Sequence, residues 1–299
     1  MTELSQEIFG NFQVRKTKKQ KQAFISLLQM HIPGLQVHES GLPKCRNLII
    51  GDPESAKVVL TAHYDTCAQL PFPNFITPKR PLISILFSIL LVIPPSLLVI
   101  LANLLLAPSI IAHYVSMFVY LLFIMMLLSG PANKHTANDN TSGVITLLEI
   151  YHKLTEEQRK QVCFVFFDNE EQGLLGSGQF RKKYKKIMRN KLLINYDCVS
   201  DGDYFLLGIS KQANQKYHVP LARSFTGTQD KDVLFENLKK IYYPSDQAGF
   251  PMAIAVAALK HKKFIGYYMD RIHTSRDTCF DESNITYLTE RTCQFIESI

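Results

Sequence analysis

Apolar residues along the chain form short runs of strand-forming residues that alternate with segments of helical periodicity. The strand-like runs lie at 35–38, 47–50, 57–62, 162–167, 192–196, 204–209, 252–259 and 264–268. Helical spacing is found at 20–31, 144–154 and 285–299, a basic helix is indicated at 179–188, and 217–238 reads as mostly helical with polar breaks. This alternation predicts an α/β fold with a mixed, mainly parallel central sheet flanked by helices.

One region departs from this pattern, because residues 81–131 contain no Asp, Glu, Lys or Arg. The segments 82–107 and 109–128 are each close to the ~20 apolar residues that cross a bilayer. A tight Ala107-Pro108-Ser109 turn between them predicts a helical hairpin with a kink at Pro94-Pro95. The alternative is a buried core hairpin of a soluble protein, but uncharged runs of this length are rare in soluble folds.

The hairpin divides the chain into three parts: residues 1–80 and 131–299 are expected to form the two parts of one domain, and 81–130 a transmembrane insertion. Lys79, Arg80 and Lys134 flank the insertion, whereas its turn carries no charge. The positive-inside bias therefore predicts a multi-pass protein of the cell membrane with two spans, in which this domain faces the cytoplasm.

The formal net charge of +7 fits this arrangement. Basic residues cluster at 15–21, 181–189 and 260–263, where nucleic acid, anionic lipid or plain solvation of helix faces are the possible explanations. The uncharged segment favours the lipid bilayer as a partner through residues 81–130, and no nucleic acid is expected.

Six cysteines show no paired spacing, which indicates reduced thiols rather than a zinc ribbon or a disulfide framework. The first twenty residues have no apolar segment behind a basic start, so no secretory signal peptide is expected. The oligomeric state stays open.

Candidate chemistry gathers where apolar strands end. The run VCFVFF at 162–167 leads into Asp168, Asn169, Glu170 and Glu171, which on an extended backbone would point to different sides. A metal ion for one glutamate and a reacting water for the other is one interpretation, and a solvated acidic loop is the plainer one. Further polar residues of this kind follow other apolar segments or lie in loops between them: His63, Asp65, Asp139, Asp197 and His273. Histidines and carboxylates at one sheet edge suit Zn²⁺ and tolerate Mn²⁺ or Co²⁺.

Five spaced motifs carry a family resemblance: HYD at 63–65, DNTSG at 139–143, FDNEEQGLLGS at 167–177, NYD at 195–197 and IHTSRDT at 272–278. In this order they resemble the di-zinc metallopeptidase family of bacterial leucyl aminopeptidases, which also contains glutamate carboxypeptidase II and glutaminyl cyclases. The resemblance covers most of the chain outside the hairpin and implies a zinc-exopeptidase-like fold.

The resemblance also implies residue roles. Asp139 would bridge two zinc ions, His63 and Asp197 would complete one site, and Glu171 and His273 the other. Glu170 would be the general base, and Asp65 would orient His63. The link between Asp139 and Asn140 matches the place of a non-proline cis peptide in that family.

These roles imply a membrane-anchored, zinc-dependent exopeptidase, an aminopeptidase that removes N-terminal residues from short peptides. The alternative is a glutaminyl-cyclase-like aminoacyltransferase with one catalytic zinc. A scaffold without catalysis is not favoured, because no ligand position is substituted. Two departures from the family pattern are Gln247, where a histidine is common, and Ile272, where some members have a tyrosine.

Overall fold

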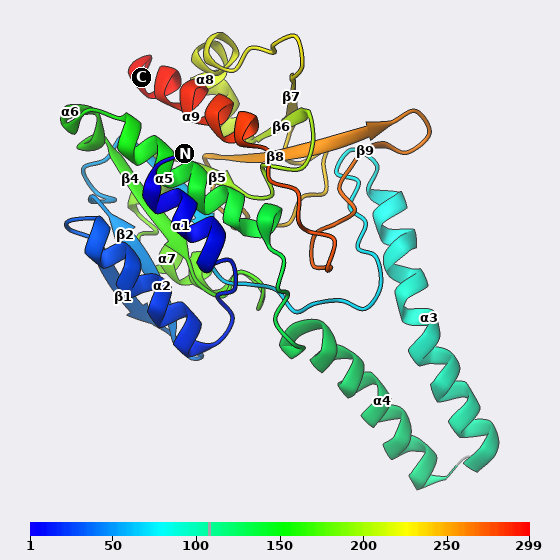
Figure 1. The fold of residues 1–299 in the computed structure, drawn as a ribbon. Coiled ribbons are helices and arrows are strands. Elements are labelled where there is room, and N and C mark those ends of the chain that lie inside the picture. The colour runs from blue at the N-terminus through cyan, green and yellow to red at the C-terminus, as the bar shows by residue number, and fades with distance from the viewer. Residues whose placement is uncertain (107–108) are drawn as a thin grey trace.

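The computed structural model describes residues 1–106 and 109–299 of the chain. In these ranges an α/β body carries a pair of long helices that project from one side (Figure 1). The helices are α1 Glu3–Asn11, α2 Lys18–His31, α3 Pro81–Leu106, α4 Ile110–Ser129, α5 Gly143–Lys153, α6 Glu156–Arg159, α7 Leu175–Lys183, α8 Lys211–Ser224 and α9 Glu282–Glu297. The strands are β1 Gln36–Ser40, β2 Cys45–Ile50, β3 Val58–His63, β4 Val162–Phe167, β5 Leu192–Tyr196, β6 Tyr204–Ile209, β7 Asp232–Asn237, β8 Ala253–Lys262 and β9 Gly266–Tyr268.

The strands form one sheet in the order β1-β2-β4-β3-β5-β8-β6-β7, and β9 pairs with β8. Strand β3 runs parallel to β4 and β5, β5 runs parallel to β8, and β6 runs parallel to β7. The pairs β1-β2, β2-β4 and β6-β8 are antiparallel. The predicted mixed, mainly parallel sheet flanked by helices is thus confirmed.

Strand β4 lies inside this sheet, and all six of its residues are buried. Because side chains alternate along a strand, Val162, Phe164 and Phe166 face the larger core. Their neighbours Cys163, Val165 and Phe167 face a smaller core on the other side of the sheet. Burial on both faces explains why the sequence shows a continuous apolar run here rather than alternation.

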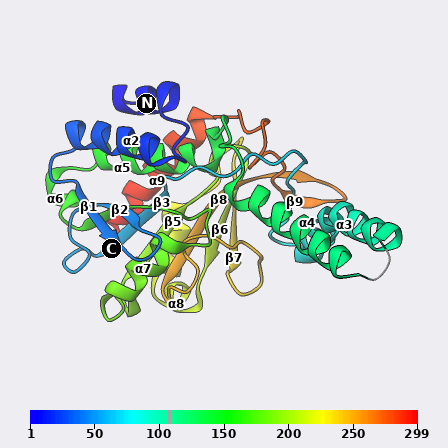
Figure 2. The same cartoon turned by 90° about the horizontal axis from the view of Figure 1, so that it is seen from below.

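Helices cover both faces of the sheet (Figure 2). On one side α1, α2, α5 and α9 contribute to the larger core, and on the other α7 supplies Phe180 to the smaller one. Helix α5 follows the helical turn Ala137–Ser142, whose backbone is not helical at Asp139 and Asn140. This interruption sets Asp139 apart from the helix that follows it.

The prediction of a mostly helical segment at 217–238 was wrong in its second half. Helix α8 begins earlier, at Lys211 after the N-cap Ser210, and ends at Ser224. The following polar, glycine-containing turn leads into β7, which pairs in parallel with β6. Hydrogen bonding to a neighbouring strand decides the conformation of this half-exposed segment, and a local pattern does not report that pairing. Helix α1 was not predicted.

The helices α3 and α4 match the predicted hairpin and lie side by side, away from the sheet (Figures 1 and 2). The first two residues of the predicted Ala107-Pro108-Ser109 turn lie outside the described residues. Only 6% of the most apolar window of each helix is buried, so the core-hairpin alternative does not fit. Interhelical hydrogen bonds join Ser96 to Tyr120, at 3.2 Å, and Asn103 to Ser116, at 3.1 Å. Both helices are long and apolar enough to cross a membrane.

The burial of β4 in the core of the α/β body can be tested by a substitution. Phe164→Ala removes a ring that is 1% exposed, and the resulting cavity should lower the free energy of unfolding by about 3–5 kcal/mol. Phe264→Ala is the matched control, because that ring is 86% exposed and its loss should change stability by less than about 0.5 kcal/mol. Denaturant unfolding of detergent-solubilised protein measures both, and equal effects would contradict the assignment of β4 to the core.

Candidate metal centre

The residues predicted from the strand ends lie together at one edge of the sheet. His63 is the last residue of β3, Asp197 follows β5, and the two glutamates come shortly after β4. Asp139 belongs to the turn before α5, and His273 to the loop after β9. Because β3, β4 and β5 are parallel, their carboxyl ends meet at the same edge, which is where open α/β sheets bind ligands.

Asp139 lies at the centre of this group, with one carboxylate oxygen toward each of two histidines. Its Oδ1 is 3.2 Å from Nε2 of His63, and its Oδ2 is 3.0 Å from Nε2 of His273. Asp197 Oδ1 lies 3.5 Å from the same nitrogen of His63, and Glu171 Oε2 lies 3.4 Å from that of His273. Two neighbouring sets of ligand atoms therefore share one carboxylate.

Asp65 holds the two glutamates through their backbone. Its Oδ1 accepts a hydrogen bond from the Glu170 amide at 3.0 Å, and its Oδ2 accepts one from the Glu171 amide at 3.3 Å. The glutamates thus lie in a turn, closed by bonds from Gly173 and Leu174 to the Glu170 carbonyl. The expectation of an extended backbone here was wrong, because these bonds fold the chain directly after β4. Both glutamates still bring a carboxylate oxygen within 4.8 Å of a His63 nitrogen.

The expected contact between Asp65 and His63 is long. Asp65 Oδ1 lies 3.5 Å from Nδ1 of His63, and that nitrogen is buried without a hydrogen-bond partner among the described residues. Nε2 faces Asp139 and Asp197, so the two ring nitrogens point to different carboxylates. The hydrogen bond through which Asp65 is expected to orient His63 is therefore not formed among the described residues.

Negative charge exceeds positive charge at the site. Burial raises the pKa of Glu171 to about 8 and that of Glu170 well above its usual value, each also raised by neighbouring carboxylates. Burial likewise raises the pKa of Asp246 to about 7. For His273, burial opposes protonation, but Glu171 and Asp139 raise its pKa to about 9. The pKa of Asp139 is lowered, since hydrogen bonds to both histidines outweigh its burial.

The donor set fits zinc. Two imidazoles and several carboxylates supply the nitrogen and oxygen ligands that zinc takes in proteins. Glu171 Oε1 and both oxygens of Asp246 are buried without a hydrogen-bond partner among the described residues. Unpaired buried charge is costly unless a cation or a proton offsets it, so cations at the edge of the sheet would relieve this site.

The backbone around the site adopts unusual conformations. Asn169, Cys198 and His273 have φ values of 56°, 56° and 61°, in the left-handed region that non-glycine residues seldom occupy. Asn169 directly precedes Glu170, Cys198 directly follows Asp197, and His273 is itself a predicted ligand. Such conformations gather at functional sites, where surrounding contacts hold them. The peptide bond between Asp139 and Asn140 is cis, as the family resemblance implied.

Sequence reasoning missed several residues that hold this arrangement. Asp277 accepts hydrogen bonds from the amides of Asn138 and Asp139, at 2.9 and 3.0 Å. Ser245 donates to Asp197 Oδ2 at 2.6 Å. Asp277 lies within the motif at 272–278 and Ser245 lies two residues before Gln247, but neither follows an apolar strand, which was the signal that marked the other candidates.

Arg15 was missed as well, because only its membership of a basic cluster was noted. Its side chain is fully buried and donates to the carbonyls of Tyr64 and Phe12 and to the hydroxyl of Thr141. Burial lowers its pKa to about 10, so it remains charged at neutral pH. The residue therefore ties the segment of His63 to the segment of Asp139, and its charge lies close to their carboxylates.

The two residues that depart from the family pattern, Gln247 and Ile272, are both buried in the structure. Gln247 is buried, where its amide donates to the Tyr243 carbonyl at 2.7 Å and its oxygen accepts from Asn195 at 3.1 Å. Ile272 is 4% exposed and packs with Leu206 and Met269 in a small core. Neither residue contributes a ligand atom to the groups described above.

Comparison with known protein families agrees with a metal-dependent peptidase. The model of peptidase family M28 matches residues 108–295. A comparison with curated protein sequences returns no match.

Solved structures share the fold at low sequence identity. A zinc-dependent exopeptidase from Parabacteroides distasonis is 14% identical, with a TM-score of 0.57 over 98% of this chain and 94% of that one. The LapA aminopeptidase of Legionella pneumophila is 13% identical, with a TM-score of 0.54 over 98% and 68%. A glutaminyl cyclase from Porphyromonas gingivalis is 16% identical, with a TM-score of 0.53 over 99% and 96%. At such identities the likeness concerns the fold alone.

The contribution of the buried Arg15 guanidinium to stability can be tested by substitution. Arg15→Ala should lower the free energy of unfolding by about 3 kcal/mol, since each hydrogen bond from a charged group contributes about 1.5–3 kcal/mol. Arg46→Ala is the control, because that guanidinium donates to Gln22 at the surface and should change stability by less than about 0.5 kcal/mol. Denaturant unfolding compares the two, and an unchanged midpoint for Arg15→Ala would contradict a structural tie between the two segments.

Proposed function

The chain belongs to peptidase family M28, and we propose that it is a membrane-anchored di-zinc aminopeptidase that acts on short peptides. The family and the shared fold support a zinc peptidase. We further propose that the site binds two ions, that the enzyme removes N-terminal residues, and that the hairpin anchors it in a membrane.

One observation carries the proposal for two ions, namely that Asp139 directs its two oxygens to two different histidines. A carboxylate placed in this way suits a bridge between two cations, whose mutual repulsion it offsets. His63 and Asp197 would hold one ion with Asp139, and Glu171 and His273 would hold the other. Zinc ions bound there would act as Lewis acids and lower the pKa of a water molecule at the site.

Glu170 suits the role of general base. Its carboxylate lies within 4.8 Å of the ligand atoms of His63 and Glu171, but it is absent from the two groups that share Asp139. A carboxylate that stays outside the shared bridge can accept a proton from a nearby water. Glu170 would accept a proton from the attacking water while the oxygen of that water bonds to the peptide carbonyl carbon. It would then pass the proton to the amine nitrogen as the C–N bond breaks.

The backbone hydrogen bonds of Asp65 would keep Glu170 and Glu171 in place during this transfer. Because both amides donate to a single carboxylate, a shift of one glutamate disturbs the other. Asp65 would therefore position both the base and a metal ligand, in addition to the orienting role toward His63.

The hairpin is proposed to anchor the domain in a membrane. Its side chains are apolar and exposed, and its base is joined to segments of the site. The amide of Asn133 donates to the Cys67 carbonyl at 3.1 Å, and the amide of Leu70 donates to the His273 carbonyl at 2.8 Å. This arrangement would keep the metal centre close to the membrane surface. The basic flanks support the cytoplasmic orientation of the catalytic domain.

A glutaminyl-cyclase-like reaction is the second candidate, since the Porphyromonas gingivalis enzyme shares the fold. A single catalytic zinc would be expected for it. The two histidines on opposite oxygens of Asp139 favour two ions and hence the peptidase.

Catalysis is tested by purified protein supplied with zinc or cobalt and a panel of N-terminally free peptides. Release of the first residue is expected, and Glu170→Gln should slow it by about 10²–10⁴-fold, because a general base contributes about that much. Metal content measured in parallel should stay at two ions per chain in Glu170→Gln. Equal rates for the variant and the wild type would contradict the role of Glu170. One tight zinc with pyroglutamate formation from Gln-peptides would instead support the second candidate.

The anchor is tested by fractionation of cells that produce the full chain. The protein should stay with membranes in high salt, because apolar spans do not depend on the charge attraction that salt screens. A variant without residues 82–128 should become soluble or salt-extractable. Release of the full chain by salt alone would point to peripheral binding through the basic clusters and would contradict the anchor.

A further inference from the structure

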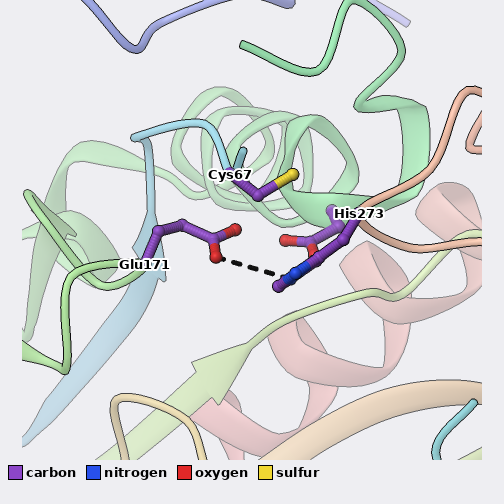
Figure 3. Close-up of side chains that lie close together, drawn as sticks. Cys67, Glu171 and His273 are labelled. Atoms are coloured by element: carbon purple, nitrogen blue, oxygen red, sulfur yellow. Dashed lines mark ion pairs between the residues drawn. The ribbon is translucent and has the colours of Figure 1, made fainter. Parts of the chain in front are cut away.

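Cys67 lies beside the ligand atoms of the second predicted ion. Its thiol is in the segment after β3, two residues beyond Asp65, and the residue is 1% exposed. Sγ and one ligand atom from each of Asp139, Glu171 and His273 all lie within 4.8 Å of one another. Figure 3 shows the Cys67 side chain beside the space between Glu171 and His273.

A second observation points to a ligand that would occupy this space. The Glu171 side chain is 8% exposed, and its Oε1 is buried without a hydrogen-bond partner among the described residues. Its other oxygen, Oε2, faces Nε2 of His273 at 3.4 Å. A buried unpaired carboxylate oxygen is costly, and a cation bound by it would remove that cost.

We propose that Cys67 supplies a sulfur ligand to the cation held by Asp139, Glu171 and His273. The inference rests on the proposed function, because it concerns one of the two ions assigned there. The thiol would bind as thiolate and release its proton to solvent, as coordinating thiols do.

The backbone of Cys67 is held in a way that fits this role. Its carbonyl accepts from the Asn133 amide, and the side-chain amide of Asn133 donates to the Thr274 carbonyl at 3.0 Å. Asn133 thereby joins the residue that carries the thiol to the residue that follows His273. Asn133 thus ties the backbone at Cys67 to the backbone beside His273, through its own backbone amide at one end and its side-chain amide at the other.

A sulfur ligand would change which metals the site prefers. Thiolate is a soft ligand that favours Zn²⁺ and similar ions over Mn²⁺ and Mg²⁺, which prefer oxygen. The site would therefore differ from its neighbour at His63, whose described donors are nitrogen and oxygen. The plain alternative is that Cys67 merely fills a small buried space, as free cysteines often do.

Cobalt substitution of the full-length, detergent-solubilised protein distinguishes these possibilities. Metal-free protein titrated with Co²⁺ should develop visible d–d absorption bands together with a near-ultraviolet sulfur-to-cobalt charge-transfer band. Cys67→Ser should lose the charge-transfer band, keep the visible bands and bind zinc at the second site at least tenfold more weakly. Circular dichroism verifies that the variant is folded, and the band in the wild type is informative without any variant.

Cys198→Ser is the matched control, because that thiol is also buried beside a predicted ligand. Its Sγ donates to Asp197 Oδ1 at 3.2 Å, yet it belongs to no candidate group of metal-binding atoms among the described residues. The charge-transfer band should therefore be unchanged in Cys198→Ser. Loss of the band in this variant, rather than in Cys67→Ser, would overturn the proposal.

The remaining outcomes separate the proposal from the function on which it rests. Visible bands without charge transfer in the wild type would show cobalt bound by nitrogen and oxygen alone, which overturns the role of Cys67 and leaves the proposed function intact. Visible bands that are absent, or that persist in Asp139→Asn, would overturn the metal centre itself and this inference with it.

Discussion

The structure depends on the burial of several carboxylates at one edge of the sheet. Asp65, Asp139, Asp197, Asp246 and Asp277 are each no more than 7% exposed, and Glu170 and Glu171 adjoin them. Close to them lie two histidines and the guanidinium of Arg15. Because buried charges of one sign repel and are poorly solvated, a site of this kind calls for bound cations. The raised pKa values of Glu171 and His273 are consequences of the same crowding.

Holding these charges in place requires support from segments far apart in the chain. Arg15 joins the segments of His63 and Asp139, and Asp277 holds Asp139 from the C-terminal side through two backbone amides. The carboxylate of Asp65 spans the turn that carries both glutamates. Each of these contacts sets an ionisable side chain against backbone or hydroxyl groups, and hydrogen bonds of such groups are stronger when the group is charged. The geometry of the site is therefore a property of the whole α/β body.

The hairpin connects this site to its proposed surroundings. Helices α3 and α4 contribute little to the core of the body, yet the segments that enter and leave them contact the neighbours of Cys67 and His273. Membrane attachment would thus fix the position of the centre as well as the location of the protein. If Cys67 binds the second ion, a residue held by the base of the hairpin would also affect metal preference.

The sequence by itself determined the elements whose signal is local. Continuous apolar runs marked β3, β4 and β5, because these strands are buried on both faces. Helical spacing marked α2, α5 and α9, which are buried on one face, and absence of charge marked the two long apolar helices α3 and α4. Strand ends also indicated His63, Asp197 and the two glutamates, since parallel strands bring their carboxyl ends to one edge, whereas Asp139 and His273 lie in a turn and a loop. Only the tertiary structure decided that Asp139 faces His63 and His273 with different oxygens, that Asp65 folds the glutamates into a turn, and that Arg15, Cys67 and Asp277 belong to the site. It also decided the conformation of β7, which pairs with β6. These features depend on contacts between residues distant in the chain, and such contacts leave no periodicity in a single sequence.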